Sequence, residues 1–280
     1  MIRQLRITQI VENAAGAPGL LGEHGAAFLV EADDRRLLFD TGQGMVLRHN
    51  VERLGLALDR VDSIVLSHGH YDHSGGLLDA LDMTGAVDLY LHPEALAPKY
   101  NRNGREIGSP VAEETLRPLC RRLVASREPV GIAPGLLLTG EIPRRHDIED
   151  TGGPFYSDPE CTRTDWLPDD QALVADTVEG LVVLLGCGHS GLVNTLDWIR
   201  HLLPSRPLHA VLGGMHLLRA DQDRLHFTAD ALAELGVAYL APNHCTGLAA
   251  ICQLRQRFPS QFRESPAGTV HSFPESAAGG

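Results

Sequence analysis

The chain alternates between two patterns of hydrophobic and polar positions. Short apolar runs such as residues 26–31 and 36–39 are typical of strands, whereas residues 44–56 carry apolar positions at helical spacing. The first third of the chain therefore predicts strands at 2–12, 26–31, 36–39, 62–67 and 88–92, and helices at 44–56 and from residue 74 onwards. Strands and helices in this order favour an α/β layered architecture.

The same alternation returns in the last third of the chain. It predicts strands at 171–176, 181–185, 208–212 and 237–240, a closing strand at 269–273, and helices at 192–203, 225–235 and 247–258. Residues 275–280 are expected to be a frayed tail.

Between about residues 93 and 168 the regularity drops. Polar stretches and stretches rich in Pro, Asp and Gly surround an expected helix at 115–124 and an expected strand at 135–140. Because a long irregular segment inside a compact domain is usually functional or mobile, we expect one domain over 1–280 with a lid or substrate-pocket insertion at about 93–168. The substrate contacts expected in this insertion are Tyr100, Arg102 and Arg105. A solvated surface excursion with no ligand role fits the sequence equally well.

Composition narrows the class of protein. With 280 residues, 43% hydrophobic content and a mean hydropathy of −0.08, the chain is expected to be soluble and globular. It has no apolar stretch of membrane-spanning length, no apolar signal region at its start and five scattered cysteines, which favours a cytoplasmic protein. A net charge of −12 disfavours binding to nucleic acid. The expected partner is a small-molecule substrate, with neither nucleic acid nor membrane, and the oligomeric state is left open.

The densest cluster of metal-binding residue types follows the strand expected at 62–67. Three histidines and one carboxylate fall within six residues there: His68, His70, Asp72 and His73. This mixture of nitrogen and oxygen donors suits zinc or iron. In an extended segment His68 and His70 point the same way. Asp72 and His73 lie further on, in the turn into the next helix. One loop can therefore supply two ligands to each of two metals. The alternative is a solvent-exposed, His-rich turn.

Three more histidines follow strands far along the chain. His189, His216 and His244 each stand beyond an expected strand. Because α/β sheets build their sites at the carboxyl ends of strands, these imidazoles are expected to meet the cluster at 68–73.

The His-x-His-x-Asp-His pattern at 68–73 resembles the signature of the metallo-β-lactamase superfamily, and the resemblance extends from about residue 7 to residue 273. Further matching motifs are Phe39-Asp-Thr-Gly42, Gly186-Cys-Gly-His-Ser-Gly191 and Pro242-Asn-His-Cys-Thr-Gly247. One subgroup also shares Glu23-His-Gly25 and Gly213-Gly-Met-His-Leu217. Its members are usually described as metal-dependent hydrolases, and some are named as dihydropterin-ribofuranosylaminobenzene phosphate synthase of methanopterin biosynthesis.

The resemblance implies an α/β fold, a four-layer αβ/βα sandwich with metals at the sheet edge. It implies two divalent metal ions, with zinc expected first and iron or manganese as alternatives. The implied ligands are His68, His70 and His189 for the first metal, and Asp72, His73 and His244 for the second. Asp40 is implied to hold the histidine loop in place from behind the ligands.

One departure from the superfamily pattern concerns the ligand between the two metals. The superfamily usually supplies a bridging aspartate at the strand end that falls here at 213–216, where no aspartate stands. His216 is expected to replace it as a ligand, to act as an acid or base or to contact substrate, and a purely structural histidine is the alternative. Without the bridge, the second metal position is expected to be weaker or differently occupied.

The expected catalytic residues are Asp72, as both ligand and proton acceptor, and His216. His24 is an expected substrate contact near the entrance of the site. Cys187 and Cys245 flank ligand positions and are interpreted as small buried packing residues rather than ligands, although a thiolate would bind zinc well.

The function implied by the resemblance is hydrolysis, in which a metal-bound hydroxide attacks a small-molecule ester, lactone or phosphoester. One alternative is a synthase acting on a phosphorylated ribosyl or pterin substrate, with an anion pocket made from arginines at 102, 105, 144 and 145. Another is a metal-containing ligand-binding protein with little turnover. The redox branch of the superfamily is disfavoured, because it places Glu where His70 stands and appends a flavodoxin domain.

Overall fold

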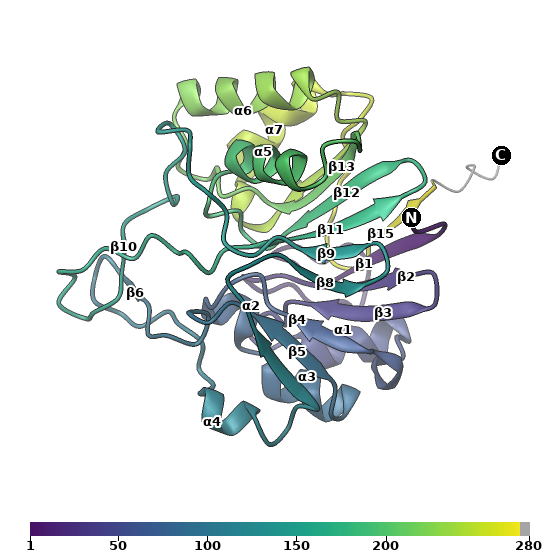
Figure 1. Cartoon of the computed structure of the whole chain (residues 1–280), viewed down its shortest axis with the longest axis vertical. Helices are drawn as coiled ribbons and strands as arrows, with labels where there is room; N and C mark the ends of the chain where they lie inside the picture. The colour runs from purple at the N-terminus through teal and green to yellow at the C-terminus, as the bar shows by residue number, and fades with distance from the viewer. Residues whose placement is uncertain (275–280) are drawn as a thin grey trace.

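The computed structural model describes residues 1–274, so the tail expected at 275–280 lies outside the described residues. Two β-sheets face one another, and helices cover the outer face of each (Figure 1). The four layers form the αβ/βα sandwich that the family resemblance implies.

The first sheet has seven strands in the order β15-β1-β2-β3-β4-β5-β7. Their bounds are β1 Leu5–Val11, β2 Ala27–Ala32, β3 Arg35–Phe39, β4 Ser63–Val65, β5 Asp88–Leu91, β7 Arg122–Ala125 and β15 Val270–Phe273. Strands β3, β4, β5 and β7 are parallel to their neighbours in this half of the sheet. Their carboxyl ends therefore share one edge, and the loop after β4 opens there.

The second sheet has six strands in the order β14-β13-β12-β11-β9-β8. Their bounds are β8 Val130–Ala133, β9 Leu136–Leu138, β11 Ala172–Thr177, β12 Gly180–Leu185, β13 Leu208–Gly214 and β14 Tyr239–Asn243. Strands β12, β13 and β14 are parallel. The loops that follow them carry the histidines at 189, 216 and 244, so these residues meet at a single edge of the sheet.

Apolar side chains fill the space between the sheets and the spaces beneath the helices. The layer between the sheets includes Phe28, Phe39 and Leu212. The helices α1 (Leu47–Leu54) and α3 (Leu77–Thr84) cover the first sheet, and α5 (Leu192–Leu202), α6 (Gln222–Glu234) and α7 (Leu248–Arg257) cover the second (Figure 1). Strands with both faces covered read as continuous apolar runs, as in β12, where every residue is buried.

The helix expected at 115–124 is wrong. Only α4 (Glu113–Leu116) is helical, and Arg122–Ala125 form strand β7. This strand pairs in parallel with β5, and the carboxylate of Asp88 binds the guanidinium groups of Arg121 and Arg122 beside it. Pairing with a neighbouring strand outweighs the helical spacing of a short segment that contains Pro118.

The segment expected as one insertion at 93–168 is divided by sheet structure. Strands β7, β8 and β9 belong to the two main sheets. The remaining excursion carries a small two-stranded sheet of β6 (Tyr100–Asn101) and β10 (Phe155–Tyr156), which projects from the body of the molecule (Figure 1). A lid role for this projection stays a prediction.

Short helical turns connect the strands to the site. They are η1 (Leu58–Arg60), α2 (Tyr71–Ser74) and η2 (His244–Thr246). Among the helices of residues 1–274, none is both long and apolar enough to cross a membrane.

The buried His271 on β15 makes the stability of the fold sensitive to acid. Its ring nitrogens contact the hydroxyl groups of Tyr239 (2.7 Å) and Ser265 (2.9 Å). Burial, and then the positive charge of Arg263, lowers the pKa of His271 from 6.5 to about 4. Unfolding exposes the ring, so below pH 6.5 the unfolded chain binds a proton that the folded chain excludes.

We therefore expect the free energy of unfolding to fall by up to about 3 kcal/mol more in the wild type than in His271→Gln between pH 6.5 and pH 4. Denaturant titrations at a series of pH values measure both slopes. Equal slopes for the two proteins would show that His271 does not contribute this pH dependence.

Candidate metal centre

The six expected metal ligands lie together at the shared edge of the two sheets. His68, His70, Asp72 and His73 come from the loop after β4 and the start of α2, His189 from the loop after β12, and His244 from η2. All six are buried. The structure thus brings together side chains that stand more than a hundred residues apart in the chain.

Three imidazole nitrogens form the first donor group. His70 Nδ1 lies 3.0 Å from His68 Nε2 and 3.2 Å from His189 Nε2. Burial lowers the pKa of His70 to about 3 and that of His68 well below its usual range, so both rings are neutral and keep lone pairs free. Converging neutral imidazoles fit a zinc-like cation.

Two imidazoles and a carboxylate form the second donor group. His73 Nε2 lies 3.2 Å from His244 Nε2, and Asp72 Oδ2 lies 3.3 Å from His244 Nε2 and 3.8 Å from His73 Nε2. Burial raises the pKa of Asp72, but the neighbouring His73 and His244 outweigh it and hold that pKa far below its usual range. Asp72 is therefore a carboxylate, and the group fits a second cation.

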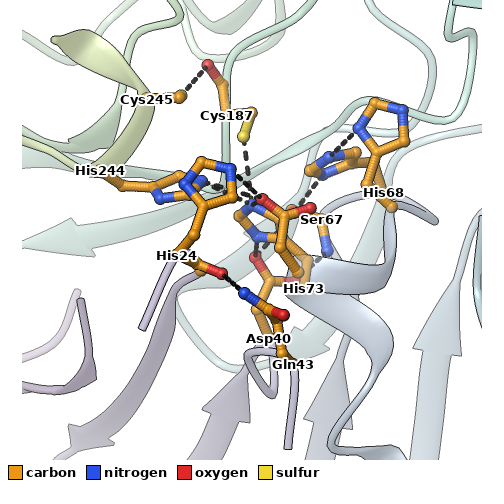
Figure 2. A network of polar contacts seen from close by, with 12 residues as sticks. His24, Asp40, Gln43, Ser67, His68, His73, Cys187, His244 and Cys245 are labelled. Carbon is orange, nitrogen blue, oxygen red and sulfur yellow. Dashed lines mark hydrogen bonds and ion pairs between the residues drawn. The ribbon is translucent and has the colours of Figure 1, made fainter. Parts of the chain in front are cut away.

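Asp40 supports both donor groups from behind (Figure 2). Its carboxylate accepts hydrogen bonds from Ser67 N, Ser67 Oγ and His73 Nδ1, each at 2.7 Å. Ser67 Oγ in turn lies 2.9 Å from His68 Nδ1. These contacts fix the rotation of His68 and His73 and are those that the role expected for Asp40 requires.

Replacing Asp40 with alanine is expected to lower the free energy of unfolding of the metal-free protein by about 3 kcal/mol, because three buried donors lose their acceptor. It is also expected to weaken zinc binding about 10–100-fold. Denaturant unfolding and competition with a chelating dye measure the two effects. The matched control is Asp34→Ala, since the Asp34 side chain is 87% exposed; equal effects in both variants would contradict the prediction.

Backbone geometry also marks the site. Asp40, His216 and His244 adopt positive φ angles of 60°, 44° and 46°, a region that residues other than glycine rarely occupy. Such conformations cluster at functional sites, where the surrounding structure holds them. A second constraint is at Gly69, where a Cβ atom would lie 1.8 Å from the carbonyl oxygen of Ala95, so only glycine fits between the first two histidines.

A buried ion cluster that the sequence analysis missed holds the histidine loop. Lys99 is 2% exposed, and its Nζ lies 2.8 Å from Asp169 and 3.2 Å from Asp165. The other oxygen of Asp169 accepts a hydrogen bond from Gly69 N at 2.8 Å. Lys99 stands in a polar stretch that reads as a surface loop, but it is the only lysine of the sequence, and that was the available signal.

The irregular segment also positions His189. The carbonyl oxygen of Thr151 lies 2.8 Å from His189 Nδ1, and Asp170 accepts a hydrogen bond from Ser190 N at 2.7 Å. Burial raises the pKa of Asp170 to about 6. Glu149 accepts two more hydrogen bonds from the first turn of α5. Residues of the range 149–170 thus position the candidate ligand His189 and its neighbours, and none of them belongs to either donor group.

A cavity of about 580 Å³ opens over the two donor groups. Its lining includes His24, Asn101, Arg102, Phe155, His216 and Arg219. His24 and Arg102 were expected as substrate contacts, whereas Tyr100 and Arg105 are not among the lining residues. His24 Nε2 lies 3.3 Å from Asp72 Oδ2, directly at the second donor group.

His216 lies in the wall of this cavity beside His189, with 4.2 Å between the ring centroids. Its Nδ1 atom is buried and has no hydrogen-bond partner within residues 1–274. His216 stands in neither donor group and lies instead with the thiols of Cys187 and Cys245. The structure thus places His216 next to the candidate ligand His189 and in the lining of the cavity.

Comparison with known proteins decides the family. The family described as the metallo-beta-lactamase superfamily matches residues 21–197, more than half of the chain. The chain belongs to the metallo-beta-lactamase superfamily. The resemblance stated from the motifs is therefore confirmed.

Relatives within the superfamily match almost the whole chain. A protein of Methanocaldococcus jannaschii named 7,8-dihydropterin-6-methyl-4-(beta-D-ribofuranosyl)-aminobenzene-5'-phosphate synthase is 29% identical, over 97% of this chain and 98% of its own length. An uncharacterised protein of the same organism is 32% identical, over 88% and 93%. The crystal structure of Tm1679, described as a metal-dependent hydrolase of the beta-lactamase superfamily, matches with a TM-score of 0.82 and 31% identity, over 95% of this chain and 98% of that one.

Proposed function

We propose that the chain is a metal-dependent hydrolase that acts on a small-molecule ester, lactone or phosphoester. The observation that carries the proposal is the pair of donor groups, three imidazoles beside two imidazoles and a carboxylate, under one cavity. Two divalent cations held there, zinc in the first instance with iron or manganese as alternatives, would activate water and polarise a carbonyl or phosphoryl oxygen.

The residues of the chain supply binding and proton transfer around this centre. Asp72, besides its place in the second donor group, is the proposed proton acceptor. Its carboxylate also contacts His24 at 3.3 Å. His216 lines the cavity beside His189 and is the proposed donor of a proton to the leaving group.

The cavity fits a substrate of small-molecule size. Arg102 and Arg219 bring positive charge to its wall, and Phe155 offers an aromatic face there. We propose that Arg102 and Arg219 contact an anionic part of the substrate and that Phe155 packs on an apolar part.

A panel of chromogenic esters, lactones and phosphodiesters tests the proposal. The zinc-loaded protein should turn over at least one class, chelation should abolish that turnover, and added zinc should restore it. Turnover that survives complete removal of metal would contradict the proposal. Full metal loading without turnover on any class would favour the synthase below or a ligand-binding protein with little turnover.

The second candidate is a synthase acting on a phosphorylated ribosyl or pterin substrate. It is favoured by the 29% identity to the named synthase of Methanocaldococcus jannaschii over nearly the full length of both proteins. Arg102 and Arg219 would then bind the phosphate. Two results together would select this candidate. The zinc-loaded protein would consume a ribosyl phosphate, with loss of this activity in Arg219→Ala, and it would turn over no ester, lactone or phosphodiester of the hydrolase panel.

We also place the enzyme in the cytoplasm, without nucleic-acid or membrane partners. Its five cysteines carry free thiols, which suits a reducing compartment. The net charge of −12 opposes binding to the phosphate backbone of nucleic acids.

A further inference from the structure

Cys187 lies between the two donor groups. Its Sγ atom is 3.1 Å from His73 Nε2, a contact that Figure 2 shows. The same sulfur lies within 4.8 Å of the ligand nitrogens of His68 and His189 on one side, and of His73 and His244 on the other. One atom thus belongs to the surroundings of both cation positions.

The strand that would supply a bridging carboxylate leaves room for sulfur instead. Strand β13 ends in Gly213 and Gly214, and a Cβ atom on Gly214 would lie 2.6 Å from the Sγ of Cys245. Cys245 Sγ in turn contacts the carbonyl oxygen of Cys187 at 3.4 Å (Figure 2). Two thiols from the loops after β12 and β14 therefore occupy the space beside this strand end.

Charge also calls for another anionic ligand. Asp72 is the only carboxylate among the six expected ligands, and the first donor group consists of imidazoles alone. Buried cations need opposite charge close by. Cys187 is 2% exposed, so its thiolate would act in a site that water screens poorly.

We propose that the Cys187 sulfur ligates both cations of this centre and takes the place of the absent bridging carboxylate. The inference rests on the proposed metal-dependent function. Metal uptake then exchanges the thiol proton for two sulfur–metal bonds and releases that proton to solvent. A shared thiolate favours zinc over manganese, because soft sulfur ligands select zinc and hard oxygen ligands select manganese.

Cobalt spectroscopy tests the sulfur bond without measuring activity. Co²⁺ is added to the metal-free protein under anaerobic, reducing conditions, and the cobalt–thiolate charge-transfer band is followed in the near ultraviolet. We expect the band in the wild type and in Cys245→Ser, and its loss in Cys187→Ser. Serine differs from cysteine by one atom, and Cys187→Ala, which should also lose the band, replaces it if Cys187→Ser fails to fold.

A metal-affinity measurement provides the second readout. Cys187→Ser should weaken the binding of zinc at least about tenfold. It should also reduce the ratio of the zinc affinity to the manganese affinity. Cys252→Ser is the matched control, since Cys252 is exposed and its replacement should change neither quantity.

The outcomes separate this inference from the proposed function. Cobalt uptake without a sulfur band would overturn the role of Cys187 and leave the metal-dependent function standing. A band that persists in Cys187→Ser and disappears in Cys245→Ser would also overturn it. Absence of any cobalt or zinc uptake would contradict the inference and the proposed function together.

Discussion

Replacing His68 with alanine is expected to lower turnover by more than about 100-fold, because loss of a ligand should exceed the 10–100-fold cost of losing a group behind one. His68 is fully buried, and its Nε2 completes the first donor group 3.0 Å from His70 Nδ1. Two imidazoles would remain there, too few for a stable three-nitrogen site.

The same substitution should remove the stabilisation of the fold by zinc. Zinc at 100 times its dissociation constant should stabilise the wild type by about 2.7 kcal/mol, and a large part of this gain should disappear in His68→Ala. Thermal unfolding with and without zinc measures it. His201→Ala is the control, since that exposed ring stacks on Trp198. An equal zinc response in wild type and His68→Ala would contradict the ligand assignment.

Replacing Lys99 with alanine is expected to lower the free energy of unfolding by about 3–5 kcal/mol, because it leaves the buried carboxylates of Asp165 and Asp169 without their cation. Since Asp169 also accepts a hydrogen bond from the amide of Gly69, which stands between two candidate metal ligands, zinc affinity should fall as well. Denaturant unfolding of the metal-free protein isolates the first effect from the second.

The matched control for Lys99 is Arg6→Ala. Arg6 forms an ion pair with Glu31 at 3.5 Å, but its side chain is 53% exposed. Exposed pairs contribute at most about 1 kcal/mol. A loss of stability in Lys99→Ala no greater than that in Arg6→Ala would show that the buried cluster does not hold the loop.

The fold and the meeting of the candidate ligands could be predicted because their signals are local. Strand-length apolar runs alternate with helical spacing in the first and last thirds, and the ligands stand directly after those strands. The closely spaced residues His68, His70, Asp72 and His73 form one candidate site with the distant histidines when all of them lie at the same sheet edge. Parallel strands provide that edge.

Features that depend on tertiary contacts could not be predicted. Strand β7 forms because β5 offers it a partner, which outweighs the helical spacing of residues 115–124. Lys99 and Asp169 stand seventy residues apart in the chain, and the sequence around either residue does not indicate that they form an ion pair. The place of Cys187 between two donor groups could not be predicted either, because it follows from the meeting of three segments: the loop after β4, the loop after β12 and η2.

The burial of the single lysine also gives this protein a built-in reporter. Its one ε-amino group is 2% exposed and engaged by two carboxylates, so amine-reactive reagents can acylate it only when the segment around it opens. The rate at which the side chain at position 99 is modified would then record how often the histidine-bearing loop detaches, and cations that secure the loop would slow the labelling.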